Sequence, residues 1–285
     1  MNTKIIRIQG QGENFSGGED MALREAGEVL RRGGLVAFPT ETVYGLGGDA
    51  LNPESSRKIY AAKGRPADNP LIVHIARTED LVRIADRISE SAMQLARAFW
   101  PGPLTMILHK SQEVPYETTG GLDTVAVRMP SHPVARRLIS YGGGYVAAPS
   151  ANLSGRPSPT SARYVKEDMD GRIDVIIDGG DGEIGLESTI VDLTVSPPQV
   201  LRPGFITRDM LAGVLGQVDL DRTLLRADSG QAPRAPGMKY RHYAPQGELT
   251  IVSGQAEQVT AYINACAAED GSRGHKVGVI ATDEE

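Results

Sequence analysis

Two cations and a carboxylate surround a turn in the segment KGRPADNP. Lys63 and Arg65 flank Gly64, and Asp68 follows shortly before LIVHI, an apolar run typical of a buried strand. A guanidinium matches phosphate oxygens in a forked geometry and an ammonium acts as a point charge, so both suit a phosphate-bearing ligand. Cations at the end of a helix also interact favourably with the helix dipole, so a structural explanation stays open.

Other polar residues lie at the ends of predicted strands. PTET (39–42) follows LVAF, PSAN (149–152) follows YVAA, EST (187–189) opens STIVDL, and Arg128 and Arg202 end TVAVR and QVLR. In open α/β sheets, ligands bind where strands end and loops supply polar groups. Each motif alone is explained by turn chemistry or a solvated charge. Together they predict one local site for a phosphate compound.

Other common catalytic signals are missing from the chain. There is no GxxxxGK[ST] loop, and GQGENFSGG lacks both the glycine register and a preceding strand. There is no GxSxG motif for a nucleophilic serine. Histidines at metal-ligand spacing are also missing, so no protein side chain is assigned to a metal. The five histidines are His74, His109, His132, His242 and His275.

The composition is that of an ordinary globular protein. The 285 residues are 40% hydrophobic and 23% charged, a length that favours two domains. No apolar run approaches the roughly 18 residues of a membrane span, and MNTKIIRIQG is unlike an export signal. The single Cys266 fits a reducing compartment, so a cytoplasmic location is expected. A net charge of −6 excludes a broadly basic surface, so any polyanion site must be local.

Helical and strand patterns alternate along most of the chain. This alternation predicts the α/β class, and the closely spaced strands between about residues 173 and 202 predict a mixed sheet. Residues 217–248 are rich in proline, glycine and charge and lack a sustained period, as in a linker. We therefore expect a catalytic domain at 1–216, a linker at 217–248 and a strand–helix–strand unit at 249–285.

Seven motifs occur in order between Gly33 and Thr207: FPTETVYGLG, KGRPADNPLIVHI, WPGPLTMIL, TVAVRMPSHP, AAPSANLSGRPSPT, ESTIVDL and LRPG. Together they resemble the YrdC/Sua5 family of L-threonylcarbamoyladenylate synthases. PGMKYRHYAP in the linker resembles a loop of the longer Sua5 branch. The resemblance implies a twisted open mixed sheet flanked by helices, with a concave, positively charged cavity. It also implies that residues 249–285 are a partial Rossmann-like βαβ unit, the first part of a domain that is complete in other Sua5 proteins.

The resemblance also implies a reaction. Family members condense L-threonine, bicarbonate and ATP into threonylcarbamoyl-AMP and pyrophosphate, with Mg²⁺ assisting. The product passes to a separate transferase that modifies adenosine 37 of tRNA. A weak contact with tRNA and no contact with membranes are expected for this chain.

The site residues carry over motif by motif. The threonine pocket would comprise Thr42, His74, Arg128, Ala148 and Ser188. The ATP site would comprise Lys63, Arg65, Asn69, Thr124, Ser150, Asn152, Ser158, Arg202 and Tyr240. Lys63 and Arg65 are expected to be catalytic, because with Mg²⁺ they would offset the charge of the leaving pyrophosphate. A general base and the role of Asp68 stay open.

Two alternatives remain at this stage. One is an RNA-binding module without catalysis, against which the low aromatic content of 5% and the lack of a basic run argue. The other is a relative with the same fold that acts on a different phosphate compound. The set Thr42, His74 and Arg128 argues against it, because it matches a pocket for an amino acid.

Overall fold

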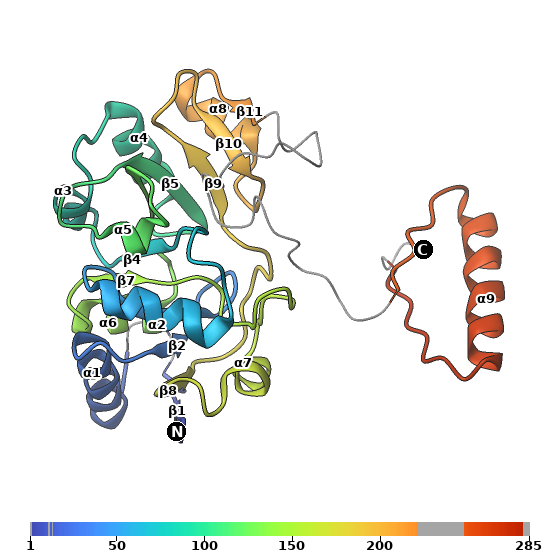
Figure 1. Cartoon of the computed structure of the whole chain (residues 1–285). Helices are drawn as coiled ribbons and strands as arrows, with labels where there is room; N and C mark the ends of the chain where they lie inside the picture. The colour runs from blue at the N-terminus through green and yellow to red at the C-terminus, as the bar shows by residue number, and fades with distance from the viewer. Residues whose placement is uncertain (1, 11, 13, 222–247, 282–285) are drawn as a thin grey trace. The chain divides into compact units, whose positions relative to one another are not determined.

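The computed structural model describes residues 2–10, 12, 14–221 and 248–281 (Figure 1). The chain divides into two compact units, Met1–Ala244 and Pro245–Glu285, and each is described by itself. Among the helices of the described ranges, none has the length and apolar character needed to span a membrane.

The described part of the first unit is built on a single sheet of eleven strands, in the order β1-β8-β2-β3-β7-β4-β6-β5-β9-β10-β11. Its central strands pair in both directions, since β4 runs parallel to β6 whereas β5 runs antiparallel to it. The predicted mixed sheet is therefore confirmed. The strands are β1 (Lys4–Arg7), β2 (Val36–Phe38), β3 (Gly45–Asp49), β4 (Ile72–Ile75), β5 (Leu104–His109), β6 (Thr124–Arg128), β7 (Tyr145–Ala147), β8 (Val175–Asp178), β9 (Thr189–Asp192), β10 (Gln199–Arg202) and β11 (Asp219–Leu220).

Most of the helices begin and end as their sequences predict. Ser89 and Thr207 cap α4 and α8 by accepting a backbone N–H, and Asn52 does the same for α2, whose first residue is a proline. The helices of this unit are α1 (Gly17–Arg31), α2 (Pro53–Lys63), the 3₁₀ turn η1 (Thr78–Asp80), α3 (Leu81–Ile84), α4 (Glu90–Phe99), α5 (Tyr116–Thr119), α6 (Pro133–Tyr141), α7 (Ala162–Met169) and α8 (Arg208–Leu215).

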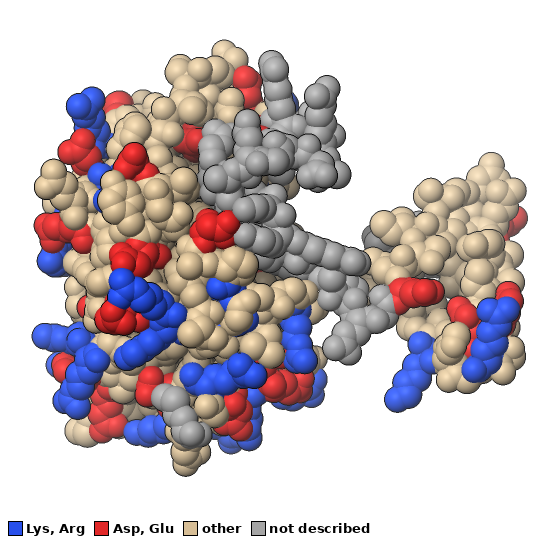
Figure 2. Space-filling view, viewed as in Figure 1, with Lys and Arg blue, Asp and Glu red and all other residues tan. Residues whose placement is uncertain are grey.

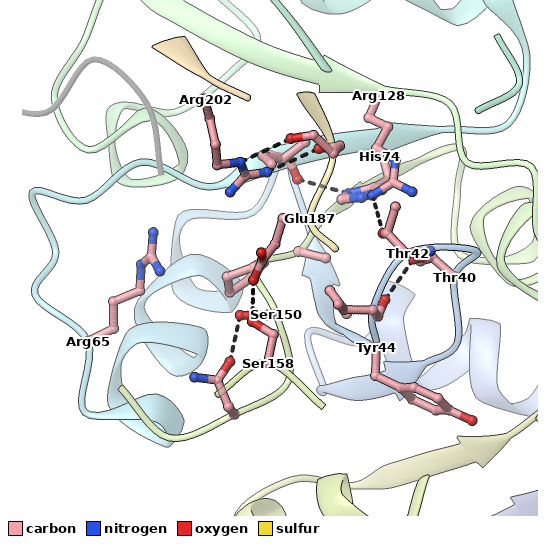
Figure 3. Close-up of a pocket in the computed structure, with 17 residues that line it drawn as sticks. Thr40, Thr42, Tyr44, Arg65, His74, Arg128, Ser150, Ser158, Glu187 and Arg202 are labelled. Atoms are coloured by element: carbon pink, nitrogen blue, oxygen red, sulfur yellow. Dashed lines mark hydrogen bonds between the residues drawn. The ribbon is translucent and has the colours of Figure 1, made fainter. Parts of the chain in front are cut away.

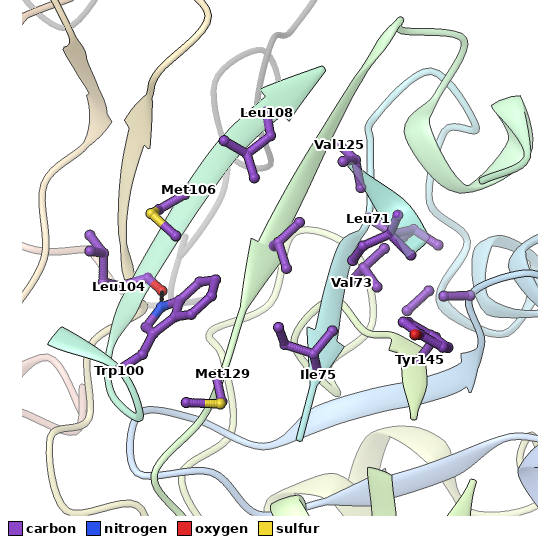
Figure 4. Packing of buried hydrophobic residues seen from close by; sticks show 14 of the residues in the cluster. Leu71, Val73, Ile75, Trp100, Leu104, Met106, Leu108, Val125, Met129 and Tyr145 are labelled. Atoms are coloured by element: carbon purple, nitrogen blue, oxygen red, sulfur yellow. Dashed lines mark hydrogen bonds between the residues drawn. The ribbon is translucent and has the colours of Figure 1, made fainter. Parts of the chain in front are cut away.

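The two faces of the sheet carry separate apolar clusters. Side chains alternate between the faces along each strand, so Val36 and Phe38 join one cluster while Ala37 joins the other. The first face packs against α2, α4, α7 and α8, and its strand residues interdigitate as Figure 4 shows. The opposite face packs against α1 and α6. Burial of both faces accounts for strands that read as continuous apolar runs.

One part of the second face carries a small cluster of its own, made of Ile72, Ile107, Ala126, Ile190 and Leu201. All five belong to the strands β4, β5, β6, β9 and β10, so none of the helices described here contributes to it. Strand residues that share this face therefore lie on the part of the sheet that α1 and α6 leave uncovered. This uncovered part is where the pocket described below is found.

Three strands were not expected from the sequence: β1, β3 and the two-residue β11, which falls in the segment expected to be a linker. β3 consists of GLGGD, and glycine is depleted in strands because it loses more backbone entropy on ordering. The glycines are needed for close packing: a Cβ on Gly47 would lie 2.8 Å from Val146 Cγ1 and 2.9 Å from Phe38 Cε1. The pairing of β3 with β2 and β7 therefore depends on residues that locally disfavour a strand.

The sequence TEDLVRIADRI predicts a single helix capped by Thr78, and this prediction is wrong. The segment forms η1 and the one-turn α3, and Asp80 rather than Thr78 accepts the backbone N–H at its start. The backbone is extended again at Ala85, which forms an isolated bridge with Lys110. Pairing with this neighbouring segment ends the helix one turn after it begins.

The second unit contains α9 (Ala256–Ser272), the helix expected in the βαβ unit. The two strands expected beside it are wrong, because neither 249–254 nor 276–281 forms a strand among the described residues. Ile251 and Ile280 are 88% and 95% exposed. A strand requires a hydrogen-bonded neighbour, and these segments lack one in the described part of the unit.

Truncating Ile59 in α2 tests the packing of the first face. Ile59 is fully buried, so Ile59→Ala removes apolar contacts and leaves a cavity, which should lower the free energy of unfolding by about 2–5 kcal/mol. The matched control is Val82→Ala, because Val82 is 74% exposed and its truncation should change stability by less than about 0.5 kcal/mol. Urea unfolding of both variants measures the difference, and equal losses would contradict the packing described here.

Candidate active site

A pocket opens on the uncovered part of the second face, and a row of strand residues forms its floor. His74 on β4 pairs in register with Arg128 on β6, and Arg128 pairs with Thr105 on β5. Thr105 in turn shares a 2.7 Å hydrogen bond with Ser188, immediately before β9. Because the side-chain period of a strand is two, these residues face the same way as Ile72, Ala126 and Ile107. The register therefore brings polar groups from four strands together.

Arg128 is the buried cation of this floor. Its Nη1 donates to Thr42 Oγ1 at 3.0 Å and its Nε donates to the carbonyl oxygen of Gly102 at 3.4 Å. Its Nη2 lies 2.8 Å from Glu41 Oε1 in an ion pair whose side chains are 5% and 7% exposed. Thr42 is oriented by Thr40, because their hydroxyls share a hydrogen bond of 2.9 Å. The guanidinium is thus held on three sides and lines the pocket.

His74 is a neutral group beside this cation. Burial is the main cause that lowers its pKa to about 3, and the positive charge of Arg128 acts in the same direction. Its Nδ1 lies 3.1 Å from the carbonyl oxygen of Ile72, and its ring meets Phe38 edge-on at 6.2 Å between centroids. Near neutral pH this imidazole can accept or donate a hydrogen bond but carries no charge.

Arg202 closes the other end of the row. Its Nε donates to the carbonyl oxygen of Ser188 at 3.0 Å, and its Nη2 donates to Ser188 Oγ at 3.1 Å. The hydroxyl of Ser188 is therefore shared between Thr105 and Arg202. This arrangement links the floor of the pocket to the end of β10.

Loops supply the remaining wall. Arg65 donates to the carbonyl oxygens of Asn69 and Pro70, which hold its guanidinium at the pocket (Figure 3). Ser150 donates to Asn152 Oδ1, and Ser158 donates to the carboxylate of Glu187. In the view of Figure 3, Glu187 lies centrally, with Arg65 and Arg202 to one side and Arg128 to the other.

The pocket carries an excess of positive charge. Of the described residues that line it, three are arginines, Arg65, Arg128 and Arg202, and one is a carboxylate, Glu187. On the face in Figure 2, by contrast, Lys and Arg side chains lie among Asp and Glu side chains, mostly over the part of the unit that holds α1 and α2. Positive charge is thus concentrated locally within a chain of net charge −6, as the site expected for an anionic ligand would require.

The pocket brings together most of the residues expected from the sequence. Thr42, Arg65, His74, Arg128, Ala148, Ser150, Asn152, Ser158, Ser188 and Arg202 all line it. Lys63 and Asn69 are buried and do not line it. Thr124 begins β6, at the opposite end of that strand from Arg128. Tyr240 lies outside the described residues. The roles assigned to all of these residues, whether or not they line the pocket, stay predictions.

Other lining and supporting residues were missed by sequence reasoning. Thr40 and Glu187 line the pocket, and Glu41 and Thr105 hold Arg128 and Ser188. Thr40 and Glu41 belong to PTET, and Glu187 belongs to EST. These motifs had already been assigned to the site, so the three residues could have been included from the sequence. Thr105 also stands inside a quoted motif, WPGPLTMIL, but its contact with Ser188 follows only from the pairing of its strand, which the sequence does not give.

The described residues contain no group of three or more His, Cys, Asp or Glu side chains placed to hold a metal ion. The oxygen groups that line the pocket include the carboxylate of Glu187 and the hydroxyls of Ser150 and Ser158. Such hard oxygen donors suit Mg²⁺, which usually binds one or two carboxylates together with substrate phosphates. The pocket therefore fits a magnesium ion that arrives with a phosphate ligand.

Family models match nearly the whole chain. A model described as telomere recombination, which represents Sua5, YciO and YrdC proteins, matches residues 28–204. A second model, described as the C-terminal domain of threonylcarbamoyl-AMP synthase, matches residues 206–285.

Individual relatives agree with these models. The threonylcarbamoyl-AMP synthase of Pyrococcus abyssi is 52% identical over 262 residues, which are 92% of this chain and 77% of that protein. The enzyme of the same name from Bacillus subtilis is 47% identical over 93% of this chain and 75% of its own length. A crystal structure of P. abyssi Sua5 complexed with L-threonine superposes with a TM-score of 0.90 at 48% identity, covering 99% of this chain and 82% of that one.

The buried neutral state of His74 makes stability depend on pH. Its folded pKa of about 3 lies below the unfolded value near 6.5, so protonation favours the unfolded chain. Its contribution is complete above about pH 6.5 and decreases as the pH falls toward 3, by up to about 1.4 kcal/mol per unit. His74→Gln should therefore lose less stability than wild type between pH 7 and 4 in urea unfolding. Parallel pH dependences of the two proteins would rule out a titrating buried His74.

Proposed function

This chain belongs to the Sua5 and YrdC family of threonylcarbamoyl-AMP synthases, and on that premise we propose that the pocket on the uncovered face of its sheet is the active site. The substrates we assign to it are L-threonine, bicarbonate and ATP. The observation that carries the assignment is the pairing of two subsites within one pocket: a floor built on Arg128, and a loop wall that carries Arg65.

The floor suits the amino acid. Arg128 is fixed by Glu41, Thr42 and Gly102, and its guanidinium can hold a carboxylate in a forked geometry. Neutral His74 can hydrogen-bond a polar group of threonine without repelling its ammonium. Ala148, which lines the pocket and is almost fully buried, leaves room for the substrate side chain. These features support a threonine site formed by Thr42, His74, Arg128, Ala148 and Ser188.

The loop wall suits the nucleotide. Arg65 and Arg202 bring positive charge to the pocket, and Ser150, Asn152 and Ser158 supply hydroxyl and amide groups. A triphosphate needs such charge and hydrogen-bond donors. Asn69, Thr124 and Tyr240 complete the proposed ATP site by resemblance to the family. Bound to the triphosphate, Mg²⁺ would neutralise phosphate charge, and Glu187 with Ser158 is the oxygen pair that could help hold it.

The product forms in two steps. The threonine amine, once its ammonium has released a proton to solvent, adds to the carbon of CO₂ with loss of a second proton, or attacks bicarbonate with loss of water, and a carbamate results. A carbamate oxygen then attacks the α-phosphorus and displaces pyrophosphate. Because the protein adds no covalent chemistry, most of the acceleration comes from positioning and from stabilisation of the leaving charge. Arg65 can stabilise that charge, since it lines the pocket. His74 is a poor proton acceptor at neutral pH because its pKa is about 3.

We also propose the cellular context that the family implies. The product would pass to a tRNA threonylcarbamoyl transferase in the cytoplasm, with a weak contact to tRNA. The single Cys266 fits that reducing compartment.

Pyrophosphate release tests the proposed reaction. We expect release from ATP only when both L-threonine and bicarbonate are present, because the carbamate is the group that attacks the α-phosphorus. A panel of other amino acids is the specificity control, and serine in particular lacks the methyl group of threonine. Pyrophosphate release that persists without threonine or without bicarbonate would contradict the proposed reaction.

Substitutions at the two subsites should affect different substrates. Arg128→Ala should raise the KM for threonine by about tenfold or more, because a charge-assisted hydrogen-bond pair is lost, and should change the KM for ATP little. Arg65→Ala should show the reverse pattern. Steady-state kinetics with each substrate varied in turn measures both constants, and equal effects on both would contradict this division of the pocket.

A further inference from the structure

The two cations of the KGR motif lie in different environments. Lys63 is the last residue of α2 and is 2% exposed, whereas Arg65 lines the pocket. Gly64 between them adopts a left-handed conformation with φ of 60°, which ends the helix and reverses the chain direction. Glycine adopts this conformation without a steric penalty. The turn therefore directs Lys63 into the interior and Arg65 toward the ligand.

The ammonium of Lys63 is already fully engaged. It donates to the carbonyl oxygens of Ser150 and Asn152, and it lies 3.4 Å from Asn152 Oδ1. A lysine ammonium has three donors, so these three oxygens use all of them. A phosphate could bind this group only by displacing one of its acceptors and reaching into the interior.

The acceptors of Lys63 belong to the loop 149–156, which forms part of the nucleotide wall. The same loop is attached at further points: Ala151 N donates to the carbonyl oxygen of Tyr44, and Ser154 N donates to that of Lys63 itself. Leu153 N donates to Asp168 Oδ2 on α7 at 2.9 Å. The loop is thus held between α2 and α7, and its residues Ser150 and Asn152 line the pocket.

A buried ammonium is tolerated only when its surroundings compensate for lost hydration. Burial lowers the pKa of Lys63 well below its usual value, and nearby Arg65 acts in the same direction, while Asp168 opposes them. Three oxygen acceptors and the carboxylate of Asp168 supply the compensation. The desolvation cost of the buried Lys63 ammonium is explained if this charge holds the loop 149–156 in place.

We propose that Lys63 is a positioning residue, whose ammonium holds the loop 149–156 in the geometry that binds the nucleotide, and that Arg65 is the cation of this motif that contacts the phosphates. This inference rests on the proposed nucleotide site. It changes the role expected for Lys63, from neutralising the leaving pyrophosphate to shaping the wall against which ATP binds. By this inference, Lys63 acts on the nucleotide only through the loop. The affinities for AMP, ADP and ATP should therefore all depend on Lys63.

Nucleotides of different phosphate number separate the two roles. Lys63→Met keeps the length of the side chain and removes its donors, so by this inference it should weaken AMP, ADP and ATP by a similar factor of about ten. Isothermal titration calorimetry measures the three affinities. A loss that grows from AMP to ATP would mean that Lys63 contacts the phosphates directly, and would overturn the inference. If wild type binds none of the three, the proposed nucleotide site itself fails.

Hydrogen exchange supplies a readout of the loop itself. The amides of Ala151, Leu153 and Ser154 should exchange faster in Lys63→Met than in wild type, because the loop loses an attachment. Lys58→Met is the matched control, because Lys58 lies on the same helix and donates instead to the carbonyl oxygen of Gly33. The control should leave both exchange and nucleotide affinity unchanged. Unchanged loop exchange in Lys63→Met would also overturn the inference.

A second variant covers the case in which Lys63→Met does not fold. Asp168→Ala removes the attachment of the same loop to α7 and leaves Lys63 in place. It should also weaken AMP, ADP and ATP by similar factors and speed exchange at Leu153. Unchanged nucleotide affinities in a folded Asp168→Ala variant would show that the loop does not shape the site.

Discussion

Arg128 places a positive charge inside the sheet, and the architecture of the pocket follows from the need to balance it. Glu41 supplies the opposite charge at 2.8 Å, while Thr42 and the carbonyl oxygen of Gly102 each accept a hydrogen bond. These partners come from the loop after β2 and from the turn before β5, which are far apart in the sequence. Burying the guanidinium with only one of these three partners would destabilise the fold, because the lost hydration would not be compensated. The guanidinium therefore joins separate segments while it still faces the ligand.

The described helices cover the two faces of the sheet unequally, and this leaves the Arg128 guanidinium accessible from the pocket. One face is packed against helices along its length, whereas on the other face α1 and α6 cover only part of the strands. The uncovered strands carry Ile72, Ala126 and Ile190 as a thin apolar layer, with polar residues next along each strand. A floor of paired strands with anchored loops above it suits a reaction governed by positioning.

Much of the fold could be predicted because local signals agreed with the tertiary structure. The α/β class, the buried strand in LIVHI and the mixed sheet are all present as expected. The failures share a cause. β3 is glycine-rich, and only its neighbours Phe38 and Val146 explain why it must be; the segments 249–254 and 276–281 have strand-like sequences but no described neighbour to pair with. Strand formation depends on partners that local sequence does not specify.

The sequence by itself determined most of the polar residues that line the pocket, because ordered motifs at strand ends identify a pocket of an α/β sheet and a family that uses it. Only the tertiary structure decided which way each residue points. The left-handed turn at Gly64 separates Lys63 from Arg65, and the register of β4, β6 and β5 aligns His74, Arg128 and Thr105. Neighbours in a motif can face opposite environments, since direction is set by backbone conformation and strand pairing rather than by residue type.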